Sequence, residues 1–147
     1  MRVQARALDE EDLPMLRAAL AAAGLPTDDI DQPGREFYAV LDHRGRTIGY
    51  GGLERHGAAA LLRSIVVPPR ERGRGQGSVI VETLEGEAAK RGITALYVLT
   101  TDATPFFARI GYASIDRASV PAAIAATSQF TTLCPATATV MRKRIGP

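Results

Sequence analysis

The sequence contains no tryptophan, only four tyrosines and four phenylalanines, and a single cysteine, Cys134. One cysteine cannot form a disulfide within the chain, and no group of cysteines and histidines has the spacing of a metal site, so we expect no metal. The scarcity of aromatic rings leaves few surfaces on which single-stranded nucleic acid could stack. These absences argue against a disulfide-stabilised, metal-dependent or single-strand-binding protein.

Long apolar runs are missing as well. Nothing approaches the roughly 20 apolar residues of a membrane span, and the first residues, MRVQARALDEED, lack the apolar stretch of a signal peptide. We therefore expect no membrane partner and, by default, a cytoplasmic location. With 147 residues and 46% apolar content, the chain suits one globular domain over residues 1–147.

The net charge is only +2, yet three arginines crowd into five positions, at Arg70, Arg72 and Arg74. Such local basicity suits a small polyanionic ligand better than a long nucleic-acid track. We expect no nucleic-acid partner.

Apolar patterns and turn signals predict an alternation of strands and helices. Strands are expected at residues 1–7, 36–41, 47–53, 58–67, 94–100, 112–115 and 136–144. Helices are expected after Asp9, over residues 77–91, after Thr104 as its cap, and from Ser119. The polar segment 27–34 reads as a loop in which no chemistry is evident. The fold class is therefore α/β: a mixed, mostly antiparallel sheet flanked by helices, with one right-handed parallel crossover around residues 77–91.

The stretch from residue 61 to 91 has the features of an anion-binding site. An apolar strand is followed by a loop rich in arginine and glycine and then by a helix, whose first N–H groups and dipole favour negative charge. Two known phosphate loops do not fit: Gly75-Gln76-Gly77-Ser78 lacks the lysine of a Walker loop, and Ser78 stands where a dinucleotide fingerprint needs glycine.

The pattern that fits is Arg72-Gly73-Arg74-Gly75-Gln76-Gly77, an R-x-x-G-x-G between a strand and a helix. It resembles the acetyl-CoA pyrophosphate loop of the GNAT N-acetyltransferases, and the order of elements resembles that fold, in which one parallel strand pair splays apart. Residues 105–112, PFFARIGY, look like the late F-Y-x-x-x-G-F element of the family. The tail VPAAIAATSQFTTLCPATA resembles that of N-acetyltransferases encoded beside arsenic-resistance genes.

The resemblance implies acetyl-CoA as the cofactor and acetyl transfer to a small amine. The residues that would hold the cofactor are Ile65, Val66, Val67, Arg72, Gly73, Arg74, Gly75, Gln76, Gly77, Ser78 and Phe107. The Val67 N–H would polarise the thioester carbonyl and stabilise the oxyanion, a catalytic role. The family's usual general acid is a tyrosine where this chain has Phe107, so no acid is assigned.

The resemblance also implies that the loop at residues 27–34 borders the acceptor pocket. On that side of the site the residues leave alternatives open. Glu54 ends a predicted strand and is either a catalytic base acting through water or a solvated hairpin carboxylate. His56 reads as a turn residue. Arg63 and Ser64 are the candidate substrate-binding residues. They should point to opposite faces of a strand, and Arg63 either binds the acceptor or forms an internal ion pair. Cys134 reads more readily as a buried structural thiol than as a reactive one.

The sequence thus predicts a ternary-complex N-acetyltransferase of small amines, by resemblance linked to arsenic resistance and amino-acid-like arsenicals. The first alternative is a non-catalytic acyl-CoA-binding module, and the second is a basic RNA-binding domain. A homodimer is possible through the apolar-rich tail.

Overall fold

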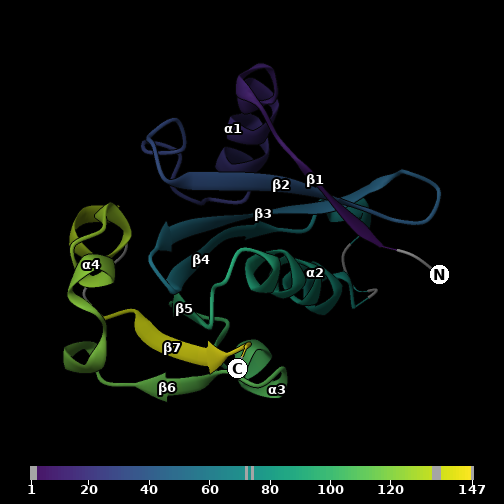
Figure 1. Cartoon of the computed structure of the whole chain (residues 1–147). Helices are drawn as coiled ribbons and strands as arrows, with labels where there is room; N and C mark the ends of the chain where they lie inside the picture. The colour runs from purple at the N-terminus through teal and green to yellow at the C-terminus, as the bar shows by residue number, and fades with distance from the viewer. Residues whose placement is uncertain (1–2, 72, 74, 134–136, 147) are drawn as a thin grey trace.

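The computed structural model describes residues 3–71, 73, 75–133 and 137–146. Within them one sheet of seven strands runs in the order β1-β2-β3-β4-β5-β7-β6 (Figure 1). The strands are β1 Gln4–Ala7, β2 Arg35–Leu41, β3 Thr47–His56, β4 Ala59–Val66, β5 Ala95–Thr100, β6 Ala113–Ile115 and β7 Thr139–Arg144. All neighbouring strands are antiparallel except β4 and β5, which are parallel. The expected mixed sheet is confirmed.

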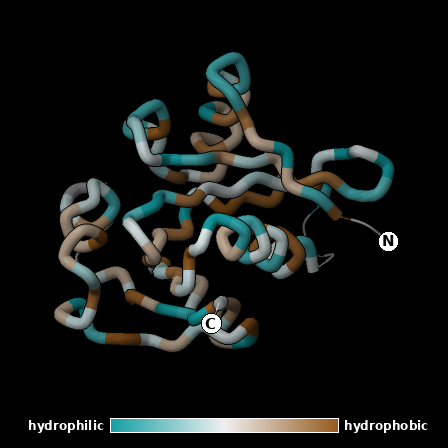
Figure 2. The backbone as a smooth tube through the Cα atoms, viewed as in Figure 1, coloured by the Kyte–Doolittle hydropathy of each residue, from teal (hydrophilic) through white to brown (hydrophobic). Residues whose placement is uncertain are grey.

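Two helices cover opposite faces of the sheet (Figure 1). Helix α1 (Leu13–Ala22) buries Leu16 and Leu20 against a cluster that includes Phe37. Helix α2 (Gln76–Lys90) buries Ile80, Val81 and Leu84 against the main core on the other face. Each helix turns its apolar stripe to the sheet, whereas the tip of the β2–β3 hairpin is hydrophilic (Figure 2).

Helix α2 approaches β3 closely because two strand residues lack side chains. A Cβ on Gly51 would lie 2.3 Å from Leu84, and one on Gly49 would lie 2.2 Å from Ile80. The glycines therefore fix the distance between α2 and the sheet, and with it the position of the loop that enters the helix.

The parallel pair separates early. Its register runs only from Ala59 to Leu61 on β4 and from Ala95 to Tyr97 on β5, although both strands continue. Beyond Leu61, β4 stays paired with β3 while β5 stays paired with β7. A gap must open between them, as the resemblance implied.

Ser64 lies where β4 bends away. Its φ of 59° is in the left-handed region, which a residue with a side chain adopts only at some cost, and the β3–β4 register shifts here. The expectation of strict alternation along this strand is wrong, because the irregularity interrupts the pleat between Arg63 and Val66.

The remaining elements are short. They are a 3-10 turn at Glu10–Asp12 capped by Asp9, a second at Pro69–Glu71, α3 Thr104–Arg109, a third turn at Arg117–Ser119, α4 Ala122–Ala125 and a π-helical segment Gln129–Leu133. Thr104 does not cap α3: the preceding residue, Ala103, is the N-cap, and its N–H donates to Thr100 Oγ1 at 2.9 Å. None of the helices in the described part of the chain is both long and apolar enough to cross a bilayer.

Candidate active site

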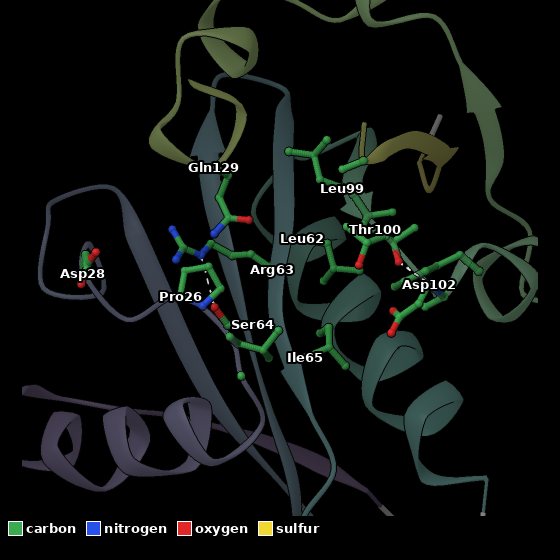
Figure 3. Close-up of a pocket in the computed structure, with 17 residues that line it drawn as sticks. Pro26, Asp28, Leu62, Arg63, Ser64, Ile65, Leu99, Thr100, Asp102 and Gln129 are labelled. Carbon is green, nitrogen blue, oxygen red and sulfur yellow. Dashed lines mark hydrogen bonds between the residues drawn. The ribbon is translucent and has the colours of Figure 1, made fainter. Parts of the chain in front are cut away.

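A cleft of about 640 Å³ opens where β4 and β5 separate. Its walls come from the ends of both strands, from α3, from the loop after α1 and from the segment after α4 (Figure 3). Most of the lining is apolar, and Ile65 and Phe107 belong to it. The polar and charged lining residues that matter here are Asp28, Arg63, Ser64, Thr100, Asp102 and Gln129.

The glycine-rich loop leads from the strand bearing this cleft into α2. Gly73 and Gly75 have φ values of 80° and 72°, and Gly75 is the N-cap of the helix. A side chain at either position would be strained, so the backbone here is left open to a ligand. Gly77 lies in the first turn, where a Cβ would come 3.2 Å from the Phe106 ring. Arg72 and Arg74 lie outside the described residues.

A buried carboxylate holds the start of this loop. Glu71 is 1% exposed, and its side chain accepts a hydrogen bond from Gln76 Nε2 at 3.4 Å and pairs with Arg46 Nε at 3.7 Å. On the helix side, the Ser78 hydroxyl donates to the Gly75 carbonyl at 3.0 Å. The loop and the first turn of α2 are thus tied to each other and to the β2–β3 hairpin.

Arg63 is buried in a network of charges beside the cleft. Nη1 and Nη2 donate to the two Asp29 oxygens at 2.5 and 2.6 Å, and Nη1 also donates to Glu54 Oε1 at 3.3 Å. The guanidinium lies 5.7 Å from the Phe37 ring centroid. Of the two alternatives for Arg63, the internal ion pair is present in the structure.

Asp29 receives more than the Arg63 guanidinium. Arg35 Nη2 donates to its Oδ2 at 3.2 Å, and the Ser128 hydroxyl donates to the same oxygen at 3.0 Å. Burial alone would raise the pKa of Asp29, but the hydrogen bonds and charge of Arg63, with help from Ser128 and Arg35, lower it to about 2. Asp29 therefore stays ionised and joins the loop after α1 to the segment after α4.

Glu54 lies inside β3, not at the strand's end, and it is 1% exposed. Its carboxylate contacts Arg63, lies 3.6 Å from Arg35 Nε and lies 3.0 Å from His56 Nε2. The solvated-carboxylate alternative for Glu54 is wrong, and His56 is the last strand residue rather than part of the turn. Glu54 does not belong to the described residues that line the cleft, whereas Arg63 does.

Arg63 and Ser64 both line the cleft, contrary to the expectation that they face opposite sides. The positive φ of Ser64 swings its side chain round, so that Arg63 Nε donates to Ser64 Oγ at 3.3 Å. Figure 3 shows the two side chains next to each other, with this hydrogen bond as a dashed line.

Aromatic side chains close the cleft at α3. Phe107 packs edge-on to Tyr112, with ring centroids 5.3 Å apart. The Tyr112 hydroxyl donates to Glu85 at 2.9 Å, and burial together with that carboxylate raises the pKa of Tyr112 well above its usual range. The Tyr112 hydroxyl is therefore already used in a hydrogen bond to helix α2. Cys134 lies outside the described residues.

The loop at residues 27–34 was expected by resemblance to border the acceptor pocket, and Asp28 in it does line the cleft. The sequence did not single out the individual residues of this region, namely Asp28, Asp29, Thr100, Asp102, Ser128 and Gln129. One signal did exist for Asp29: an arginine within an apolar strand needs an acidic partner. Nothing in the sequence selects which of the 16 acidic residues supplies it.

Comparisons with known proteins agree with this geometry. The model of the Acetyltransferase (GNAT) family matches residues 5–112. An uncharacterized N-acetyltransferase, CT2212, from Chlorobaculum tepidum is 28% identical over 122 residues, which cover 80% of this chain and 77% of that protein.

Solved structures share the fold at low identity. N-acetylglutamate synthase from Neisseria gonorrhoeae, complexed with coenzyme A and N-acetyl-glutamate, has a TM-score of 0.79 at 16% identity. That match covers 99% of this chain but only 35% of the synthase, so this chain spans about a third of that relative's length. Tetrahymena GCN5 has a TM-score of 0.74 at 16% identity, with 99% of this chain and 96% of that one covered. With its splayed parallel pair and glycine-entered helix, the chain belongs to the acetyltransferase (GNAT) family of N-acyltransferases, whose cosubstrate is acetyl-CoA.

Proposed function

We propose that this enzyme acetylates a small primary amine that binds in the cleft beside Arg63, while acetyl-CoA is held at the same time. The observation that carries the proposal is the early separation of β4 from β5. It produces a cleft of about 640 Å³ on the strand that leads directly into the glycine-rich loop. Binding both reactants next to one another supplies much of the rate acceleration.

The start of α2 is the proposed pyrophosphate site. A helix of 15 residues presents unpaired N–H groups at its first turn, and the residues there are Gln76, Gly77 and Ser78, preceded by Gly73 and Gly75. The left-handed Gly73 and Gly75 leave room for phosphate oxygens against the backbone. Arg72 and Arg74 are proposed to add positive charge, on sequence grounds alone.

The strand end is the proposed site for the pantetheine arm and thioester. Ile65 and Val66 occupy the end of β4 that has left β5, and Val67 follows directly after the strand. Ile65 and Phe107 both line the cleft. The Val67 N–H is proposed to polarise the thioester carbonyl.

Acetyl-CoA supplies the acetyl group: its carbon–sulfur bond breaks as a carbon–nitrogen bond to the amine forms, and the sulfur leaves as a thiolate that takes up a proton. The acceptor must first lose a proton, because free alkylammonium groups have a pKa of about 10. Water in the open cleft is the proposed acceptor of that proton.

For Glu54 we propose a positioning role instead of the direct base that the sequence suggested. Its oxygens already contact Arg63, Arg35 and His56, and the Arg63 guanidinium stands on the cleft side of it. A base needs to reach the proton that it removes. Glu54 is better placed to keep Arg63 in one orientation.

The link to arsenic resistance rests on the tail resemblance alone, and that tail lies beyond the residues that the family model matches. It favours a toxic amine as the acceptor, with an amino-acid-like arsenical as one candidate. That candidate differs from a simple amine by a carboxylate, which the cleft must accommodate.

The test is mass-spectrometric detection of acetylated products from an amine library incubated with the enzyme and acetyl-CoA. A product heavier than its amine by one C2H2O unit, the mass added when an acetyl group replaces a hydrogen, is the expected result. Tight coenzyme A binding without any acetylated amine would contradict the proposal.

A further inference from the structure

The charge of Arg63 is already balanced by the protein. Asp29 accepts hydrogen bonds from both Nη atoms, Glu54 accepts a further one from Nη1, and Ser64 accepts from Nε. Four of the five N–H groups of the guanidinium are thereby used. Because the pKa of Asp29 is lowered to about 2, its negative charge persists at every pH at which the enzyme would work.

Arg63 is the one cation among the described residues that line the cleft. An acceptor carboxylate would have to displace Asp29 from a bidentate contact and leave that buried acid unpaired. Breaking such a pair costs far more than an exposed contact returns. Among the residues that the structure describes, the cleft therefore has no ready partner for a carboxylate on the acceptor.

The cleft does carry unbalanced negative charge. Asp28, in the loop after α1, and Asp102, after β5, are both exposed lining residues. Neither forms an ion pair or a side-chain hydrogen bond with another residue in the described part of the chain. Figure 3 shows them on opposite sides of the cleft, with Arg63 and Ser64 between them.

We propose that the acceptor is a diamine-like cation: a primary amine with a second cationic group and no carboxylate, attracted by Asp28 and Asp102. The inference rests on the proposed function and narrows its substrate class. The apolar lining between the two acids, which includes Leu62 and Leu99, suits the alkyl chain that separates two amines. By the same reasoning an amino-acid-like arsenical is a poor acceptor.

The experiment compares matched pairs that differ only by the α-carboxylate: putrescine with ornithine, cadaverine with lysine, and agmatine with arginine. The expected result is a higher kcat/KM for the member without the carboxylate, by about tenfold, as for two partly screened charge contacts. Putrescine should also exceed butylamine, which lacks the second cation. Equal rates within pairs, or faster acetylation of the amino acids, would overturn the proposal.

Variants test whether Asp28 and Asp102 cause the preference for acceptors without a carboxylate. Asp28→Asn combined with Asp102→Asn changes two exposed side chains, so folding should be unaffected, and the preference within each pair should fall about tenfold. Asp116→Asn is the matched control, because Asp116 is exposed and does not line the cleft. An unchanged preference in the double variant would place the discrimination elsewhere and reject the role of these acids.

Calorimetry separates failure of the inference from failure of the proposed function. Putrescine and ornithine are titrated into the protein saturated with coenzyme A. If no amine is acetylated, the proposed function fails, whereas tighter binding of putrescine that is lost in the double variant would still show that Asp28 and Asp102 select a cation without a carboxylate. If amines are acetylated but ornithine binds as tightly as putrescine, only the inference fails.

Discussion

Arg63 and Asp29, 34 residues apart in the chain, meet in a bidentate ion pair with N–O distances of 2.5 and 2.6 Å. Asp29 comes from the loop after α1, whereas Arg63 comes from β4 just before it bends. Ser128, from the segment after α4, donates to the same carboxylate. One buried acid therefore connects three parts of the chain around the cleft.

Removing that acid should be costly. Asp29→Ala leaves Arg63 buried with only Glu54 as an acidic partner in direct contact, and losing one member of a buried pair typically costs about 3–5 kcal/mol. Urea unfolding should show this loss, with Asp31→Ala, an exposed neighbour, within about 0.5 kcal/mol of the wild type. Equal midpoints for the two variants would mean that the pair contributes nothing to stability.

The same pair predicts a dependence of stability on pH. The pKa of Asp29 in the folded protein, about 2, lies below its ordinary value of 3.8, so the ionised acid stabilises the fold above pH 3.8 and this contribution is lost as pH falls through 2. Its size is about 2 kcal/mol. The difference in free energy of unfolding between wild type and Asp29→Asn should therefore be largest near neutral pH and should shrink by about that amount by pH 2. A difference that stays constant with pH would contradict the assignment.

The sequence predicted the local parts of this fold well. Helix α2 lies within one residue of its expected bounds because its apolar spacing is regular and Gly92 follows it. Strand β5 begins one residue after the expected start and is rich in apolar and β-branched residues. The glycine-rich loop could be located because a loop between a strand and a helix is recognised from adjacent residues.

What the sequence could not predict depends on contacts between distant segments. The partner of Arg63 lies in a polar loop in which no chemistry was evident, since Asp29 is marked as special only by the fold around it. The φ of 59° at Ser64 is set by the separation of two strands and not by its own preference, so the strand appeared regular. The sequence pattern placed Glu54 at the end of a strand because the next two residues, Arg55 and His56, are polar. In the structure β3 continues through both of them.

The glycine loop offers a test of cofactor binding with an internal control. Gly75→Ala and Gly45→Ala both place a Cβ at a left-handed φ, 72° and 80°, with no neighbouring atom within 4 Å. Each should cost about 1 kcal/mol of stability. Only Gly75→Ala should weaken coenzyme A binding, by at least about tenfold, because its Cβ would stand where a phosphate approaches the helix start.

Isothermal calorimetry with coenzyme A measures this difference directly. Gly45 lies in the β2–β3 hairpin, between strands that end at Leu41 and begin at Thr47, so its substitution reproduces the strain away from the loop. Equal affinity for the two variants would remove the α2 start from the proposed pyrophosphate site.

Tyr112 should be structural rather than catalytic. Tyr112→Phe removes the hydroxyl that donates to Glu85 and leaves Lys143 as the partner of that carboxylate, at 3.0 Å. The expected loss of stability is about 1–2 kcal/mol. The steady-state kcat should be unchanged, and a large fall in kcat without loss of stability would identify Tyr112 as the acid that protonates the thiolate.

Glu54→Gln decides between the two roles considered for this residue. Glutamine keeps the shape and can still accept a hydrogen bond from Arg63 through its carbonyl oxygen, so a positioning residue should lose only a few-fold in kcat/KM, and the shape of the pH–rate profile should persist. Removing a general base instead costs about 10²–10⁴-fold and abolishes the limb of the profile that it controls. Glu54→Leu supplies the matched comparison, because it also removes the hydrogen bond to Arg63 and should lower both stability and the discrimination between putrescine and ornithine. If the glutamine variant were as inactive as the leucine variant while remaining as stable as the wild type, Glu54 would be the base after all.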